Sequence, residues 1–409
     1  MPLLMLTATP ATAAAQQSTV LPERERILTS EPTQVYSVGK EEGESWELLA
    51  SVVSTAFDEN DNLYVMDAGN HRVLVFDPAG RFLRQIGKQG QGPGELMAPL
   101  GMVVGVNGDV IVADAGRGGY TIYGADGGYK ETVIATSEGR MFMATGFQAS
   151  PLGGIVARSM PTVTRSAQGV QAGSGKSPVM HHPLAGEREP TTLYEIDIPP
   201  PRVTEQGNQQ NRRVVMVLSA PPIFTPNVSW GVLPTGSIAV NNSARYAIQI
   251  IDPHGSVQRI IRRDEEPRRV THRDREAGRE RQREQMQNPR NAVRVTNQGG
   301  RMGFSRGGGG MTEQQIEERL RDIEFADVMP LVQGLTTDVH GRIWVHRTGE
   351  RAVGPGPIDL LDADGRYIGT LRGAALPDAV SASGLAAFIE RDELDIERVV
   401  VRKLPADWR

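Results

Sequence analysis

The feature that most restricts how this sequence can fold is a meander of short strands that recurs along the chain. Residues 62–86 alternate apolar and polar side chains, turn at a glycine, alternate again and turn once more. The same pattern returns at 107–134, 235–261 and 340–371. A strand-rich unit that recurs every 20–50 residues or so is typical of a repeat architecture rather than of separate domains.

Each copy carries the same kind of turn near its end. Asp77-Pro-Ala-Gly80 in the first copy is matched by turns that end at Gly128, Gly255 and Gly365. An aspartate caps a type I turn and the glycine supplies a positive φ, so these segments join adjacent antiparallel strands. A further strand is expected ahead of each copy, at 51–57, 101–106, 227–233 and 332–339. Each unit is therefore predicted to be a four-stranded antiparallel meander, as in a propeller blade.

A third unit in chain order is less regular than the others. Residues 144–158 supply its first two strands, and we expect 191–198 and 213–218 to complete it. The stretch between, 159–190, is rich in Ser, Gly, Pro and Thr and is predicted to be a mobile loop.

The last unit is incomplete on its own, with strands only at 383–391 and 396–403. Near the N-terminus, 33–38 is a strand without a local partner. We expect it to complete the last unit, because closing a ring with both chain ends removes exposed strand edges. The sequence thus predicts an all-β fold, a six-bladed β-propeller of four-stranded antiparallel blades over residues 30–403.

One stretch also resembles a known family. Tyr64-Val-Met-Asp67-Ala-Gly-Asn70-His-Arg72-Val, with Gln91-Gly-Pro-Gly-Glu95 and Pro99 after it, resembles the NHL-repeat group of six-bladed, TolB-like propellers. The resemblance covers 50–135 well and is fair over 225–262 and 330–372. It implies the propeller fold and an exported bacterial protein. It implies no single function, because the group holds binding scaffolds, lyases and lactonases.

Residues 265–329 interrupt the ring between its fourth and fifth units and are predicted to be a helical, Gly-rich insertion. Residues 266–290 carry many Arg with interspersed Glu and Asp, and 299–310 are rich in Gly. We predict two helices joined by a flexible Gly-rich loop. The first helix is interpreted as a solvated helix with i,i+4 ion pairs, the alternative being contact with an acidic partner such as nucleic acid or acidic lipid.

The second helix is predicted over 312–325. Thr312 followed by Gln315 fits a capping box, and Ile316, Leu320 and Ile323 recur at helical spacing. So short an apolar stripe favours packing on the propeller over a cofactor site.

The N-terminus suggests export. Leu3, Leu4 and Leu6 form a short apolar patch, and the alanines at 13–15 before Gln16 resemble a small-residue cleavage site. Residues 1–17 are therefore predicted to be the remnant of a signal peptide, the alternative being a disordered tail. A periplasmic or extracellular protein is expected.

Composition excludes several classes of function. No apolar run approaches the ~18 residues of a membrane helix, so no membrane span is expected. The net charge of -5 gives no global signature of nucleic-acid binding, and no nucleic-acid partner is expected. The absence of cysteine rules out disulfides and thiolate metal sites. A monomer is expected.

The ligand site is expected at the mouth of the central channel, where the second strands of the blades end in register. A ring of polar groups around one concavity is the default ligand site of such a fold. Arg158, Arg347 and Arg391 would suit a carboxylate or phosphate. For Asp67, Asn70 and Arg72 a purely structural role in tying the turn is the alternative. The candidate ligand-binding residues are Asp67, Asn70, His71, Arg72, Asp114, Arg117, Arg158, Asn242, His346, Arg347 and Arg391.

Two functions fit these residues. The first is a non-catalytic propeller that binds a protein, peptide or small anionic ligand at the mouth, with no cofactor. The alternative is a metal-dependent hydrolase or lyase, lactonase-like or amidating-lyase-like, with calcium or zinc in the channel. Only His71 and His346 are expected to face the mouth, too few to hold zinc. Asp67, Asp114 and Asn242 are candidate calcium ligands, but neighbouring arginines would repel the ion. No catalytic residue is assigned.

Overall fold

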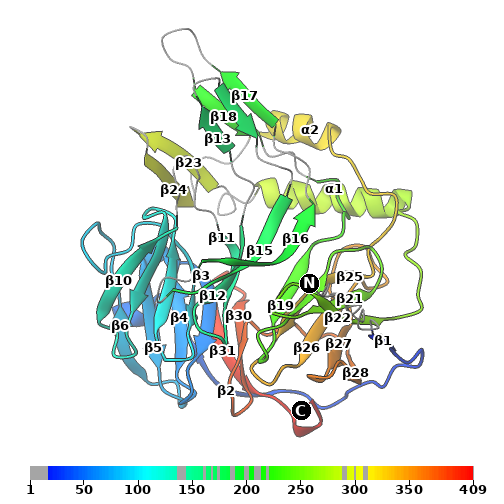
Figure 1. Ribbon diagram of the computed structural model, residues 1–409, viewed down its shortest axis with the longest axis horizontal. Coiled ribbons are helices and arrows are strands. Elements are labelled where there is room, and N and C mark those ends of the chain that lie inside the picture. Colours follow the sequence, from blue (N-terminus) through cyan, green and yellow to red (C-terminus); the bar gives the residue numbers. More distant parts are fainter. Residues whose placement is uncertain are drawn as a thin grey trace, which may run out of the picture.

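The protein is a six-bladed β-propeller with two helices between its fourth and fifth blades, as the sequence predicts (Figure 1). The computed structural model describes residues 17–135, 144–159, 163–166, 169–172, 176–184, 189–197, 202–206, 213–217, 221–287, 293–298, 301–306 and 312–408. Each blade is a four-stranded antiparallel meander, and blades are numbered here in chain order of their first strands. Blade 4 also carries a fifth, parallel strand at its edge.

The strands of each blade run from first to fourth in the following order. Blade 1 contains β3 (Val52–Phe57), β4 (Leu63–Asp67), β5 (Arg72–Phe76) and β6 (Phe82–Ile86). Blade 2 contains β7 (Pro99–Val104), β8 (Val110–Asp114), β9 (Gly119–Tyr123) and β10 (Tyr129–Ile134). Blade 3 contains β11 (Ala144–Ala149), β12 (Ile155–Ser159), β15 (Lys176–His182) and β16 (Thr191–Asp197).

Blade 4 contains β19 (Ser229–Val232), β20 (Ile238–Asn241), β21 (Ala247–Ile251) and β22 (Val257–Arg262). Blade 5 contains β25 (Val332–Thr337), β26 (Ile343–Arg347), β27 (Ile358–Leu361) and β28 (Tyr367–Leu371). Blade 6 contains β29 (Ala379–Val380), β30 (Leu385–Arg391), β31 (Glu397–Lys403) and β2 (Thr33–Val38).

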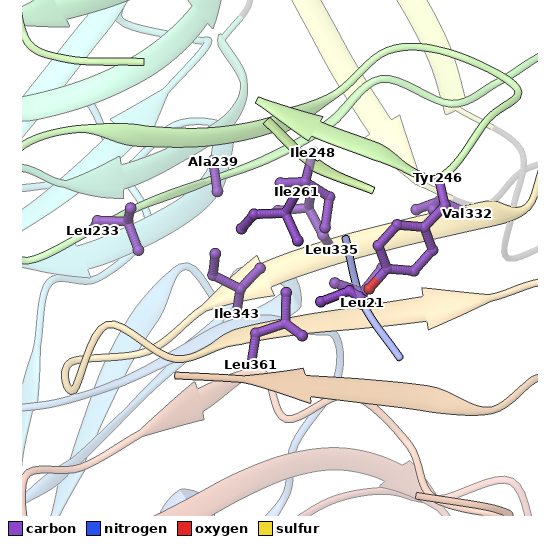
Figure 2. Close-up of a cluster of buried hydrophobic side chains, with 11 residues drawn as sticks. Leu21, Leu233, Ala239, Tyr246, Ile248, Ile261, Val332, Leu335, Ile343 and Leu361 are labelled. Atoms are coloured by element: carbon purple, nitrogen blue, oxygen red, sulfur yellow. The ribbon is translucent and has the colours of Figure 1, made fainter. Parts of the chain in front are cut away.

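Both chain ends contribute to blade 6, which confirms the predicted closure. The N-terminal strand β2 pairs antiparallel with β31, and Tyr36 lies opposite Val401. Every pair of neighbouring blades, including blades 6 and 1, shares a buried apolar cluster. Figure 2 shows the cluster between blades 4 and 5, where Ile248 and Ile261 meet Ile343 and Leu361.

Three of the four predicted turns have the expected Asp-x-x-Gly geometry; in blade 2 the turn spans 124–127, and its glycine with positive φ is Gly127 instead of Gly128. Asp77 Oδ1 accepts from the backbone N–H groups of Ala79 at 3.0 Å and Arg81 at 2.9 Å. Gly80 follows with φ 81°, which a residue with a side chain rarely adopts. The aspartates at 252 and 362 cap their turns with the same pair of bonds.

A segment that the sequence analysis did not anticipate runs along the outer edges of blades 4 and 5. We call residues 17–28 the N-terminal strap. Its strand β1 (Gln17–Val20) pairs in parallel with β22 of blade 4, and Ile27 forms a parallel bridge with Thr370 of blade 5 before the chain enters blade 6. Leu21 and Leu28 are buried, so the strap is part of the core. Of the predicted signal remnant, residues 1–16 lie outside the described residues.

The prediction for blade 3 was wrong in its outer half. Its third strand is β15, within the stretch predicted as a loop, and its fourth is β16. Residues 213–217 instead form β18 (Arg213–Val217), which pairs with β17 (Arg202–Gln206) outside the blade. β15 contains Pro178 and two His and lacks an Asp-x-x-Gly turn after it, so the pattern of the other blades does not reveal it.

Three insertions interrupt the ring. The first is the hairpin β13 (Val163–Ser166) and β14 (Gly169–Ala172) in blade 3, and the second is the β17–β18 hairpin between blades 3 and 4. The third contains α1 (His272–Gln287), β23 (Val293–Gln298), β24 (Arg301–Arg306) and α2 (Glu313–Arg321). Both predicted helices are confirmed, including the capping box of Thr312 and Gln315.

The prediction of a flexible Gly-rich loop between the helices was wrong over much of its length, because β23 and β24 pair there as a hairpin. Apolar residues alternate at 293 and 295 and again at 302 and 304, with Gly299-Gly300 between them. That is a hairpin pattern, which the abundance of glycine obscured.

Candidate functional site at the mouth face

All three insertions emerge on the same face of the ring. In an antiparallel meander, the connection from second to third strand and the connection to the next blade lie at the same end. The first insertion occupies the former position in blade 3, and the other two follow fourth strands. We call this side the mouth face. In Figure 1 the hairpins and helices gather beyond the upper ends of the blades, and β14 lies against β17.

The base of the third insertion is anchored to blade 5. The Val270 N–H donates to Asp327 O at 2.9 Å and the Met329 N–H to Arg268 O at 2.8 Å, which closes the base like a short ladder. Val270 and Met329 are buried together with Ala352, from the loop between β26 and β27. The insertion is therefore packed on the mouth face at its base.

The Arg-rich helix α1 is less solvated than predicted. Gly278 faces Phe224 and Phe325 so closely that a Cβ there would lie 3.0 Å from the Phe325 ring. The guanidinium groups of Arg275 and Arg279 lie over the same ring, at 6.0 and 5.1 Å from its centroid. Several of its arginines thus serve packing, as cation–π contacts of this kind do.

The N-terminus of α1 is capped by its own third residue. The Asp274 carboxylate accepts from Thr271 N and Oγ1 and forms two bonds with Arg268, at 2.6 and 3.0 Å. These donors, Arg268 first, hold the pKa of Asp274 far below its usual range. At the other end, Arg283 pairs with Glu317 and so ties α1 to α2.

The structural role given above as the alternative is the one that the hydrogen bonds show for Asp67, Asn70 and Arg72, which we call the clamp. The Asp67 carboxylate is fully buried and accepts from the backbone N–H groups of Ala50 and Ser51, each at 3.1 Å. Asn70 Nδ2 donates to it at 2.7 Å, and Arg72 Nε and Nη2 at 3.2 Å. Arg72 also donates to carbonyl groups of the chain entering blade 1, so the clamp fixes that entry.

Asp114 and Arg117 repeat this arrangement one blade further on. Asp114 is fully buried and accepts from Met97 N and Ala98 N, both at 2.8 Å. Arg117 donates to the carbonyl groups of Gly92 and Glu95. Both residues thus hold the strand entry of blade 2 and have few remaining donors or acceptors for a ligand.

Arg391 and Arg347 are paired with carboxylates. Arg391 donates to Asp395 and Glu397, each at 2.7 Å, and these carboxylates raise its pKa. Arg347 donates to Glu25 of the strap, and its Nε lies 3.4 Å from an oxygen of Asp359. Their positive charge is therefore already neutralised within the protein.

The two histidines expected at the mouth are engaged by backbone. His71 adopts a left-handed conformation with φ 55°, and its Nε2 lies 3.2 Å from Met97 O. His346 Nε2 accepts from the Gly356 N–H at 3.1 Å, and burial lowers the pKa of this imidazole. Neither geometry resembles a metal ligand set.

Arg158 and Asn242 lie at the mouth-face end of the interface between blades 3 and 4. Arg158 Nε donates to Ser177 Oγ at 2.9 Å, and burial lowers the pKa of the guanidinium. Asn242 is exposed, one residue beyond the end of β20, and its amide donates to the Tyr194 hydroxyl. Among the residues that the structure describes, no carboxylate pairs with Arg158. This distinguishes it from Arg72, Arg347 and Arg391.

The sequence analysis missed a buried ionic cluster between blades 4 and 5. Asp359 is fully buried, accepts from Arg263 Nε at 2.9 Å and from Thr370 Oγ1 at 2.6 Å, and lies beside Arg347. Arg263 also donates to Pro22 O of the strap at 2.9 Å. An aspartate within the otherwise apolar strand β27, Ile-Asp-Leu-Leu, was the one local signal of this cluster.

A second missed residue is Asp378, directly before the first strand of blade 6. It retains solvent exposure, yet the surrounding protein raises the pKa of its carboxyl, with the Ile389 N–H donating to it at 2.8 Å. It lies at the mouth-face end of β29.

Within the described part of the chain, no three His, Asp or Glu side chains lie close enough together to hold a metal ion. Nor does any helix in those residues have the length and apolar character needed to cross a membrane.

Comparisons with known proteins support the fold. A family model described as a 6-bladed beta-propeller matches residues 47–136. No curated protein matches the chain. Solved structures with the same fold include an exported protein from Bacteroides fragilis, which is 11% identical, with 95% of this chain and 99% of that chain covered and a TM-score of 0.45.

Two enzymes are similar to a lesser degree. A gluconolactonase from Xanthomonas campestris is 11% identical, with 90% and 87% of the two chains covered and a TM-score of 0.39. Virginiamycin B lyase from Staphylococcus aureus is 8% identical, with 87% and 95% covered and a TM-score of 0.39. Likeness at this level does not carry an activity to this chain, because one fold hosts many functions. What the comparisons and the structure establish together is a six-bladed β-propeller.

Proposed function

We propose that this protein is a non-catalytic, extracytoplasmic propeller that binds a protein, peptide or small anionic ligand on its mouth face. The observation that carries the proposal is the placement of the three insertions. They enter the chain at separate points and rise from one face, whereas the turns from first to second strand on the opposite face span only a few residues, such as 105–109, 233–237 and 338–342. Binding residues of repeat folds concentrate on the face that carries the insertions.

The polar groups of the mouth favour binding over catalysis. Asp67, Asp114, Arg347 and Arg391 are engaged in bonds within their own blades or with the chain that enters them. Arg158 has a cationic group without a described counter-charge, which favours an anionic ligand. Location outside the cytoplasm is proposed from the Ala-rich segment before Gln16 and from the NHL-like motif around Asp67.

Shortening one insertion tests the proposal. A variant in which a short Gly-Ser turn replaces residues 160–175 joins β12 to β15 directly, and these strands are already antiparallel neighbours. We would screen small carboxylates, phosphates and short peptides by thermal shift against the wild type and this variant. The matched control carries an altered turn at 105–109 on the opposite face. Ligands are expected to stabilise the wild type and the control but not the shortened variant.

Equal stabilisation of all three proteins would contradict the proposal. The alternative, a metal-dependent hydrolase or lyase, makes a separate prediction: calcium or zinc should copurify at one ion per chain, and removing it should abolish hydrolysis of lactone substrates. That result would replace the binding function.

A further inference from the structure

We propose that Arg158 and the Tyr194 hydroxyl form a subsite for a small oxyanion, a carboxylate or a phosphate, at the mouth-face end of the interface between blades 3 and 4. The inference rests on the proposed function and deepens it by naming the chemical group that is recognised and the residues that recognise it.

The strand register places both side chains on one face of blade 3. Val156 and Val179 belong to the buried cluster shared with blade 4, and Arg158 follows Val156 by two residues. Arg158 lies opposite Val179, and Val179 lies opposite Tyr194, so the three side chains share this face. The Cα atoms of Arg158 and Tyr194 are thus two strand spacings, about 10 Å, apart. Both side chains are long enough for their tips to reach one small ion between them.

Arg158 carries a positive charge that no carboxylate among the described residues compensates. Its Nε is fixed by Ser177 Oγ, which orients the planar guanidinium and leaves the two Nη groups to meet a ligand. Burial disfavours the charged form, and the described residues supply no carboxylate to offset that cost. Pairing with an anion therefore stabilises this half-buried charge strongly. The planar fork of N–H groups also matches the two oxygens of a carboxylate or phosphate.

Tyr194 contributes a second donor. Its hydroxyl oxygen accepts from the Asn242 amide of blade 4, so its own hydrogen is oriented away from that bond and can donate. The two carboxylates on its strand, Glu195 and Asp197, alternate to the other face of the blade, where Glu195 pairs with Lys176. The face of blade 3 that carries Arg158 and Tyr194 therefore presents donors, which select an anion over a cation.

The test measures oxyanion binding with three variants of the full chain. Melting temperature would be followed during titration with sodium phosphate and, separately, sodium acetate, with sodium chloride keeping the ionic strength constant. The variants are Arg158→Met, Tyr194→Phe and the control Arg366→Met, which removes an exposed arginine on the outer turn of blade 5.

At least one of the two oxyanions is expected to stabilise the wild type and Arg366→Met beyond the effect of chloride. Affinity should fall about 10- to 100-fold in Arg158→Met, as for loss of a charged hydrogen-bond donor, and several-fold in Tyr194→Phe. A response to acetate alone identifies a carboxylate ligand, and a response to phosphate alone identifies a phosphate.

Two results would overturn the subsite: no oxyanion-specific stabilisation of the wild type, or unchanged affinity in Arg158→Met. If Arg158→Met does not fold, Tyr194→Phe decides in the same way. Neither result touches the broader mouth-face proposal, which depends on the shortened insertion variant.

Discussion

Arg158 and Arg347 both lie near the end of a second strand, in blades 3 and 5, but they face opposite sides of their blades. Arg347 pairs with the first residue of β25, whereas in blade 3 it is Ser159, one residue after Arg158, that pairs with the first residue of β11. Arg347 lies between two carboxylates, one from the third strand of its own blade and one from the N-terminal strap. Arg158 meets a serine hydroxyl and, within the described residues, no carboxylate. Arg347 thus stabilises the ring through carboxylates, whereas Arg158, on the other face of its blade, has no carboxylate partner among the described residues.

The difference arises from distant parts of the chain. Glu25 is 322 residues away from Arg347 and reaches it because the strap follows the edge of blade 5. In the described residues no such segment pairs with the edge of blade 3, which carries the β13–β14 hairpin on the mouth face. We infer that the role of an arginine on the mouth face depends on the blade face that it occupies and on the distant segment that covers it.

The largest expected effect is on the paired interface. Asp359→Ala should lower the free energy of unfolding by about 3–5 kcal/mol, because it leaves the buried Arg263 and the adjacent Arg347 without their shared counter-charge. Urea unfolding followed by tryptophan fluorescence measures this change. A loss below about 1 kcal/mol would mean that the cluster is not the main polar tie between blades 4 and 5.

A smaller effect is expected when one of its two arginines is removed. Arg347→Met should cost about 1–3 kcal/mol, since Asp359 retains Arg263 and Glu25 retains Arg372. The same unfolding experiment applies, with Arg366→Met as the exposed control at a cost near zero. If Arg347→Met were as stable as that control, its pairing would be incidental.

The smallest effect concerns the strap and depends on pH. Although burial opposes it, bonding to Arg347 and Arg372 lowers the pKa of Glu25. A carboxyl with a lowered folded-state pKa stabilises the protein above its unfolded pKa of about 4.3, and this contribution disappears as the pH falls through the folded value. Glu25→Gln should therefore cost about 0.5–1 kcal/mol at pH 7 and almost nothing at pH 3. A cost that is equal at both pH values would contradict the ion pairs.

How far the sequence could predict the molecule follows from the range of the interactions involved. The blade repeat, the turns at Asp77 and Asp252 and the closure by residues 33–38 depend on local periodicity and on one topological rule, and all were predictable. β15 was not, because it contains a Pro and two His where the other third strands are largely apolar. The strap could not be predicted either, since its position depends on pairing with β22 and Thr370, which are distant in the sequence, and its own residues show no strand pattern.

The candidate site could be placed only roughly. The sequence shows that polar residues end the second strands. It does not show whether each is already hydrogen-bonded within the protein, as Asp67 is to the Ala50 N–H and Arg347 is to Glu25. Asp359 and Arg263 are 96 residues apart and were not paired by any local pattern.

The most direct test of the account compares the two arginines in one experiment, with urea unfolding of Arg158→Met and Arg347→Met in chloride buffer without other anions. We expect Arg347→Met to lose about 1–3 kcal/mol, and Arg158→Met to stay within about 0.5 kcal/mol of the wild type or to exceed it, because removing an uncompensated charge relieves a desolvation cost. A loss in Arg158→Met as large as that in Arg347→Met would contradict the account, because it would show that Arg158 already has a structural partner.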